Sequence, residues 1–116
     1  MLMTHALAEM YDCLPVIEDE VALVAAARAA VQSVGATIIG EYEVRYVPHG
    51  LTIALFLAES HIVLTTWPEY RLLLLDVLLC NPQMDFHRVV AEIRQRVCPD
   101  GEIAVHEVGR KIAAQL

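Results

Sequence analysis

A glutamate followed by a serine, Glu59-Ser60, lies in the apolar segment LAESHIVLTTWPEY (57–70). A serine hydroxyl can attack the carbonyl of the residue before it when the backbone is strained and donors hold the developing oxyanion. The resulting ester breaks on loss of the Ser60 Cα proton, and the dehydroalanine left behind hydrolyses to a pyruvoyl group. That carbonyl is an electron sink that forms a Schiff base with an amine substrate, as pyridoxal phosphate does. Serine is common in turns, so the dipeptide alone does not predict this chemistry.

Other catalytic signatures are missing from the sequence. It has no glycine-rich phosphate loop, no paired-cysteine metal spacing and no His-x-x-x-His on a helix. The five histidines are scattered at positions 5, 49, 61, 87 and 106. Because zinc ligands come in closely spaced sets, we interpret them as surface or hydrogen-bonded residues and expect no metal site.

Composition indicates a small domain with a partner. The chain has 116 residues, which predicts a single domain over 1–116. Hydrophobic residues make up 57% of the chain, and a domain of this size cannot bury that much apolar surface by itself. We therefore expect a further apolar contact, most simply in a homodimer. The net charge of −7 argues against a nucleic-acid partner and favours a cationic ligand.

Several features predict a cytoplasmic protein without a membrane span. The apolar run 71–80 contains Asp76 and falls short of the roughly 20 residues that a span needs. The N-terminal segment has no basic start and no cleavage signal. The odd cysteine count, with Cys13, Cys80 and Cys98, is typical of free thiols in a reducing compartment.

The order of elements predicts an α+β fold. Residues 21–34 form an expected helix between the cap Asp19 and the terminator Gly35, with one face made of Val21, Val24, Arg28, Val31 and Val34. A second helix is expected from Asn81-Pro82 to about residue 97. Strands are expected at 36–47, 51–58, 61–66, 72–79 and 102–108, with another possible at 4–11. These elements predict an antiparallel sheet with two helices on one face. The bare apolar face would meet a second copy and give α/β/β/α layers.

The residues around Ser60 resemble those of the prokaryotic S-adenosylmethionine decarboxylases. The segment LAESHIVLTTWPEY (57–70) and the following DVLLC (76–80) match that family's pattern at most positions. HALAEMYDC (5–13) is similar to its opening, and GATIIGEYEVRYVPHGLT (35–52) to its central hairpin. The resemblance covers about residues 5–107.

The resemblance implies roles for the central residues. Ser60 would become the pyruvoyl group, with cleavage after Glu59, and Cys80 would return a proton to the substrate Cα after decarboxylation. A free thiol is mostly protonated at neutral pH, which suits that task. From the residues alone, a buried and inert thiol is the preferred interpretation of Cys80.

The resemblance also implies substrate contacts. Glu69 would hold the ribose hydroxyls, Tyr46 would stack on adenine, and Trp67 would lie against the substrate. Without the family, Tyr46 is simply an aromatic residue of a strand.

One departure from the family pattern concerns the cleavage step. The family has a histidine, thought to remove the Ser60 Cα proton, where this chain has Thr65, and usually a serine at Thr52. Threonine cannot act as a base at neutral pH. In a tight hairpin Thr52 lies across from Thr65, and both lie far from Ser60. Further departures, which suggest a changed pocket, are Asp12, Arg71, Leu72 and Asn81, three of them in place of glycine and Leu72 in place of tyrosine.

Three functions are compatible with these features. The first is a self-cleaving, pyruvoyl-dependent S-adenosylmethionine decarboxylase that serves spermidine biosynthesis. The second is the same chemistry on a basic amino acid such as ornithine or arginine. The third is a family homologue that does not mature and acts as a binding or regulatory protein, since a shared fold does not guarantee a shared function.

Overall fold

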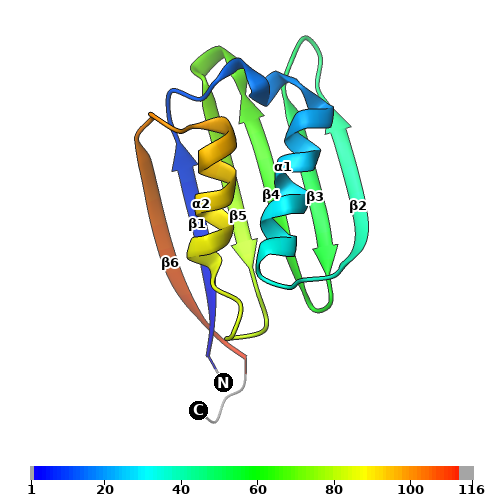
Figure 1. Ribbon diagram of the computed structural model, residues 1–116, viewed down its shortest axis with the longest axis vertical. Helices are drawn as coiled ribbons and strands as arrows, with labels where there is room; N and C mark the ends of the chain where they lie inside the picture. The colour runs from blue at the N-terminus through cyan, green and yellow to red at the C-terminus, as the bar shows by residue number, and fades with distance from the viewer. Residues whose placement is uncertain (1, 113–116) are drawn as a thin grey trace.

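The computed structural model describes residues 2–112 as one six-stranded antiparallel sheet with two helices packed on one face (Figure 1). The strands are β1 (Leu2–Met10), β2 (Ile38–Arg45), β3 (Leu51–Leu57), β4 (Ser60–Trp67), β5 (Leu72–Leu78) and β6 (Ile103–Lys111). The helices are α1 (Glu20–Ser33) and α2 (Phe86–Val97), and short 3-10 turns cover η1 (Pro15–Glu18) and η2 (Pro68–Tyr70). The expected α+β class is confirmed, including the N-terminal strand.

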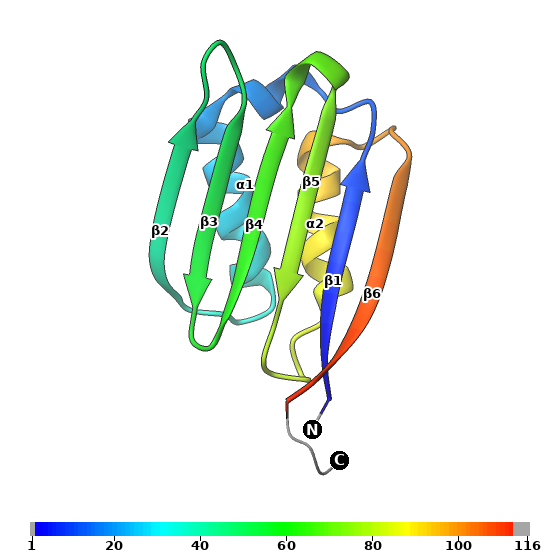
Figure 2. The same cartoon turned by 180° about the vertical axis from the view of Figure 1, so that it is seen from behind.

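The strand order in the sheet is β2-β3-β4-β5-β1-β6. Strands β2 to β5 follow one another as neighbours, because short turns join each to the next. The first strand breaks this order, since β1 lies between β5 and β6 and pairs antiparallel with both (Figure 2). The N-terminal strand is therefore an interior strand of the sheet, paired with two strands that come late in the sequence.

The second helix begins later than the sequence predicts. Instead of starting at Asn81-Pro82, α2 starts at Phe86. The Asn81 side chain accepts a hydrogen bond from the Gln83 backbone N–H at 2.8 Å and so stabilises a turn. Asp85 then caps the helix by accepting from the His87 N–H at 2.9 Å. Asparagine and aspartate side chains stabilise turns and helix starts in this way.

The first helix has the predicted ends, and its predicted face is correct at Val24 and Val31, which are buried, but wrong at Val21 and Arg28. Asp19 caps α1 by accepting from the Ala22 N–H, and Gly35 follows the helix at a φ of 80°. Val21 is 80% exposed, however, and Arg28 turns outward to Glu41 on β2. The buried face holds Leu23, Val24, Ala26, Ala27, Ala30 and Val31. Its alanines let α1 approach its neighbours closely, and this decides which face is buried.

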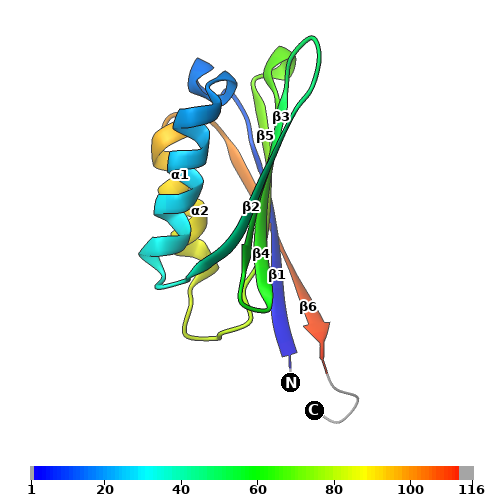
Figure 3. The ribbon, with the colours of Figure 1, turned by 90° about the vertical axis from the view of Figure 1, so that its right-hand side faces the viewer.

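The core lies between the helices and the sheet. Alternate side chains of the central strands point toward the helices and are buried: Leu51, Ile53, Leu55, Leu57, Ile62, Leu64, Leu73, Leu75 and Val77. The opposite side of the sheet carries no helix, as the edge-on view shows (Figure 3). We call this side the open face. Its residues include Tyr42, Phe56, Val63, Leu72, Leu74 and Leu78. Neither helix within residues 2–112 is long and apolar enough to cross a membrane.

Candidate active site

Ser60 lies at the tip of the β3–β4 hairpin. Ala58 and Glu59 form the turn, and Leu57 pairs with Ser60 across it. Glu59 has a φ of 60°, in the left-handed region that residues other than glycine rarely adopt. Such a conformation stores on the order of 1–3 kcal/mol of strain. The strained residue is the one whose carbonyl the Ser60 hydroxyl would attack.

Cys80 lies beside this turn. The Ser60 hydroxyl and the Cys80 thiol donate to the same acceptor, the Ala58 carbonyl, each at 3.3 Å. Cys80 is partly exposed and lines a surface hollow with Met3, Glu59 and Asn81. Of the predicted catalytic residues, the structure therefore brings Glu59, Ser60 and Cys80 together. The buried thiols are instead Cys13 and Cys98.

Three hydroxyl groups form a chain elsewhere on the open face. The Tyr46 phenol lies 2.9 Å from the Thr52 hydroxyl, which lies 3.1 Å from the Thr65 hydroxyl. Thr52 pairs directly with Thr65 between β3 and β4, as the sequence predicts. The two predicted processing residues thus meet each other and the predicted adenine-stacking residue.

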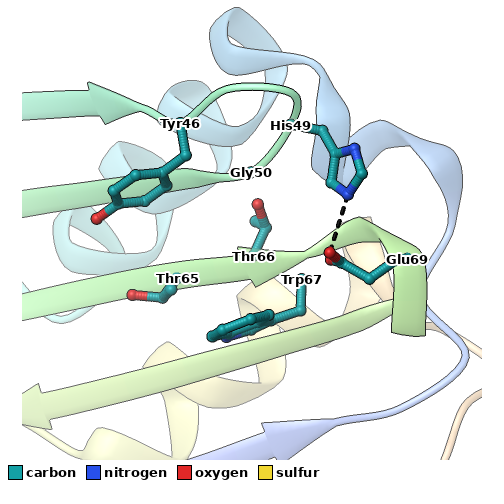
Figure 4. A pocket seen from close by; sticks show the side chains of 7 residues that line it. All are labelled: Tyr46, His49, Gly50, Thr65, Thr66, Trp67 and Glu69. Carbon is teal, nitrogen blue, oxygen red and sulfur yellow. Dashed lines mark hydrogen bonds and ion pairs between the residues drawn. The ribbon is translucent and has the colours of Figure 1, made fainter.

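A pocket of about 290 Å³ lies beside these hydroxyl groups, at the end of the sheet opposite Ser60 (Figure 4). Its lining includes the three predicted substrate residues Tyr46, Trp67 and Glu69. The other lining residues are His49, Gly50, Thr65 and Thr66. The buried Thr66 hydroxyl accepts from the Leu51 N–H at 2.9 Å and joins β4 to the start of β3. The pocket therefore has a fixed floor and an aromatic, half-open rim.

His49 is a pocket residue that the sequence reasoning missed. Its Nε2 lies 2.9 Å from Glu69 Oε2, and this hydrogen bond holds the pKa of Glu69 below its usual range. The pair favours the ionised carboxylate of Glu69, whose two oxygens can both accept hydrogen bonds from hydroxyl groups. The two residues are 20 apart in the sequence, so no local pattern signals the pair.

The two sets of residues lie at opposite ends of β4. Ser60 begins this strand and Trp67 ends it. Thr65 lies five positions after Ser60 along the strand, and at about 3.3–3.4 Å per position this is roughly 17 Å. Thr65 and Glu69 therefore do not reach Ser60 within one chain.

Two of the residues that replace glycine in the family pattern keep a left-handed backbone conformation. Asp12 and Arg71 have φ values of 58° and 52°. Aspartate tolerates this region better than arginine does. The Arg71 Nε also donates to the Cys13 carbonyl at 3.3 Å, which stabilises the turn after η2. The chain path is thus kept while the side chains differ.

Comparisons with known proteins agree with this architecture. The family model for S-adenosylmethionine decarboxylase matches residues 4–111. An S-adenosylmethionine decarboxylase proenzyme of Thermosipho melanesiensis is 34% identical over 82 residues, which span 70% of this chain but only 63% of that relative. Those of Thermotoga petrophila and Methanococcus maripaludis (strain C5) are 30% and 31% identical over 109 residues, covering 91% and 93% of this chain and 83% and 88% of theirs. The crystal structure of the Aquifex aeolicus adenosylmethionine decarboxylase superposes with a TM-score of 0.86 at 28% identity, covering 99% of this chain and 95% of that one.

Proposed function

The chain belongs to the S-adenosylmethionine decarboxylase family, and we propose that it is a self-cleaving, pyruvoyl-dependent decarboxylase of S-adenosylmethionine that serves spermidine biosynthesis. The observation that carries the proposal is the convergence of Ser60 and Cys80 on one carbonyl behind a strained Glu59. The relatives' names favour this substrate over a basic amino acid.

Cleavage would begin at the strained turn. The Ser60 hydroxyl turns from the Ala58 carbonyl to the Glu59 carbonyl carbon, bonds to it, and displaces the Ser60 nitrogen. Loss of the Ser60 Cα proton then expels the Glu59 carboxylate and leaves dehydroalanine, which takes up water and releases ammonia. The left-handed φ of Glu59 supports this step, because strain in the scissile segment is relieved when the peptide bond breaks.

The surroundings of residue 60 fit the group that results. A pyruvoyl carbonyl supplies the electron sink for loss of carbon dioxide from an amine-bearing substrate. The Cys80 thiol would donate a proton to the substrate Cα, and its hydrogen bond to the same Ala58 carbonyl as Ser60 supports this role. Its partial exposure leaves a path for substrate from the hollow that Cys80 lines.

A second copy of the chain would complete this site. Two sheets can pack through their open faces about a two-fold axis perpendicular to the strands. The end of one sheet that carries Ser60 then lies against the end of the other that carries the pocket. The partner subunit's Thr65 and the partner subunit's Glu69 then face Ser60 across roughly 10 Å, the spacing of packed sheets. The exposed Tyr42 and Phe56, at 65% and 48%, support burial of this face. Light scattering should give twice 12.9 kDa, and a monomer would contradict the arrangement.

The pocket would then hold the nucleoside part of the substrate. We assign Glu69 to the ribose hydroxyls, with His49 orienting its carboxylate. The exposed rings of Tyr46 and Trp67 supply flat apolar surfaces for adenine. The net charge of −7 suits a cationic sulfonium substrate.

Intact mass spectrometry tests the cleavage directly. Wild-type protein should give two fragments, one ending at Glu59 and one beginning with a pyruvoyl group at residue 60. Ser60→Ala should remain one chain, because alanine has no hydroxyl to attack Glu59. The matched control Ser33→Ala, in α1, should cleave as the wild type does.

Two outcomes would overturn the proposal. Both fragments in Ser60→Ala would exclude the hydroxyl attack. An unbroken wild-type chain after long incubation would favour a homologue that does not mature, for which the loss of a base at Thr65 is the physical reason. Release of carbon dioxide from S-adenosylmethionine, with ornithine and arginine as comparisons, identifies the substrate of the cleaved protein.

A further inference from the structure

A cluster of two histidines and an aspartate lies on the open face near the end of the sheet that carries Ser60, since His61 directly follows Ser60 on β4. His5 on β1 and His61 on β4 both pair with Leu78 of β5, one from each side. Asp76 lies two residues along β5 on the same face and reaches both rings diagonally. Its Oδ1 lies 2.6 Å from His5 Nε2 and 3.4 Å from His61 Nε2.

We propose that His5, His61 and Asp76 bind a divalent transition-metal ion of the Zn²⁺ type. One ligand atom from each lies within 4.8 Å of the others. Metal–ligand bonds of about 2.0–2.1 Å in a tetrahedron put neighbouring ligand atoms about 3.3 Å apart, so small side-chain shifts suffice. Two imidazoles and one carboxylate are a donor set that Zn²⁺ and Fe²⁺ accept, with an outer position left open.

The position of the cluster favours binding over a loose surface contact. Its three members come from neighbouring strands, so the sheet holds their backbones rigidly. Leu7 and Val63 flank Asp76 on either side through direct pairing. The side chains of His5 and His61 are only 16% and 32% exposed. Within residues 2–112, no other group of three such ligands lies this close together.

Arg110 gives the proposal a specific consequence. Its Nη1 lies 3.2 Å from His5 Nδ1, and a guanidinium can only donate. The His5 proton is therefore on Nε2, where it is donated to Asp76. Binding of a metal at Nε2 requires that proton to be at Nδ1 instead, so the exposed Arg110 must swing away. Glutamine at position 110 can accept from Nδ1–H, as the outer partners of metal-bound histidines do.

The test is a titration of the full chain with Zn²⁺ against a chromophoric chelator, with Co²⁺ absorption as a second readout. One ion per chain should bind. His61→Gln and Asp76→Asn should each weaken binding by about 100-fold or more, since even outer-shell changes cost about 10- to 100-fold. Arg110→Gln should strengthen it. The control His106→Gln removes a histidine that pairs with Glu9 at 2.7 Å on the same face and should leave binding unchanged.

The outcomes are decisive in either direction. A wild-type chain that takes up no stoichiometric Zn²⁺, or folded His61→Gln and Asp76→Asn variants that bind as the wild type does, would overturn the proposal. Circular dichroism checks that each variant is folded. If only one of the two variants folds, that variant alone is enough for the test. Because Ser60 cleavage is not involved, the Ser60→Ala chain should bind equally well. Failure of the metal site is therefore distinguishable from failure of the self-cleavage proposal.

Discussion

Replacing Thr65 by histidine should accelerate cleavage, and it should do so between subunits. A positioned general base contributes about 10²–10⁴-fold, or about 3–5 kcal/mol of barrier. Thr65 cannot supply this catalysis, because its hydroxyl is not a base at neutral pH. Since about 17 Å of strand separates residue 65 from Ser60, an imidazole there cannot reach the Ser60 Cα proton of its own chain. Only the partner subunit's residue 65 can serve.

Mixed dimers separate the two cases. A donor chain carrying both Ser60→Ala and Thr65→His cannot cut itself, and it is co-expressed with a differently tagged wild-type acceptor. Intact mass against time should show the acceptor cleaved about 10²–10⁴-fold faster than with the matched donor Ser60→Ala. Hydroxylamine, which attacks esters and leaves amides, should cut any ester that accumulates at Glu59 in the slow pairing.

Equal rates with both donors, while the Thr65→His homodimer matures quickly, would refute the reasoning about geometry. The base would then act within one chain. Wild-type protein that matures within minutes of synthesis would show that Thr65 does not limit the step. A Thr65→His chain that stays uncut and releases nothing with hydroxylamine would place the defect earlier, in the attack by Ser60.

Three further predictions concern the thiols and the packing. Cys80 alone should react with a thiol reagent in the folded protein, and all three cysteines should react after unfolding; fast labelling of Cys80→Ser would contradict this. Burial, with the nearby Cys98, raises the pKa of Cys13 from about 9 to about 12. The unfolded chain therefore loses this proton first, and chemical denaturation should show stability falling as the pH rises from about 9 toward 12. Gly101→Ala should destabilise by about 3 kcal/mol or more, because its Cβ would lie 1.8 Å from the Tyr11 carbonyl oxygen, whereas Gly40→Ala, with only ordinary contacts, should change the melting temperature little.

The strands were predictable because their residues signal them locally. β-branched and leucine-rich runs bounded by turns gave each strand to within about three residues, and the pairing of Thr52 with Thr65 followed from the short turn between them. The buried face of α1 was predictable only in part, at Val24 and Val31. Alanine contributes little to the hydrophobic periodicity from which a buried helix face is predicted. In the structure, Ala26, Ala27 and Ala30 are nevertheless buried, and Val21 is exposed to solvent.

The candidate site was only partly predictable for a related reason. Glu59, Ser60 and the motif that follows them are contiguous, so their resemblance to a family is visible in the sequence. The His49–Glu69 pair joins residues 20 apart, and His5 meets Asp76 across 71 residues. Such contacts depend on the register and order of the strands, which scattered histidines do not reveal.

The position of β1 has a consequence for the life of the cleaved protein. Cutting after Glu59 leaves one piece with β1, α1, β2 and β3 and another with β4, β5, α2 and β6. Because β1 is clamped between β5 and β6, and β3 pairs with β4, neither piece can depart without breaking strand pairs on two fronts. Folding of the precursor is unimolecular, whereas reassembly of the pieces is bimolecular and depends on concentration. The cleaved protein should therefore stay assembled under native conditions. After denaturation and dilution, its two pieces should fail to reassemble into the folded protein.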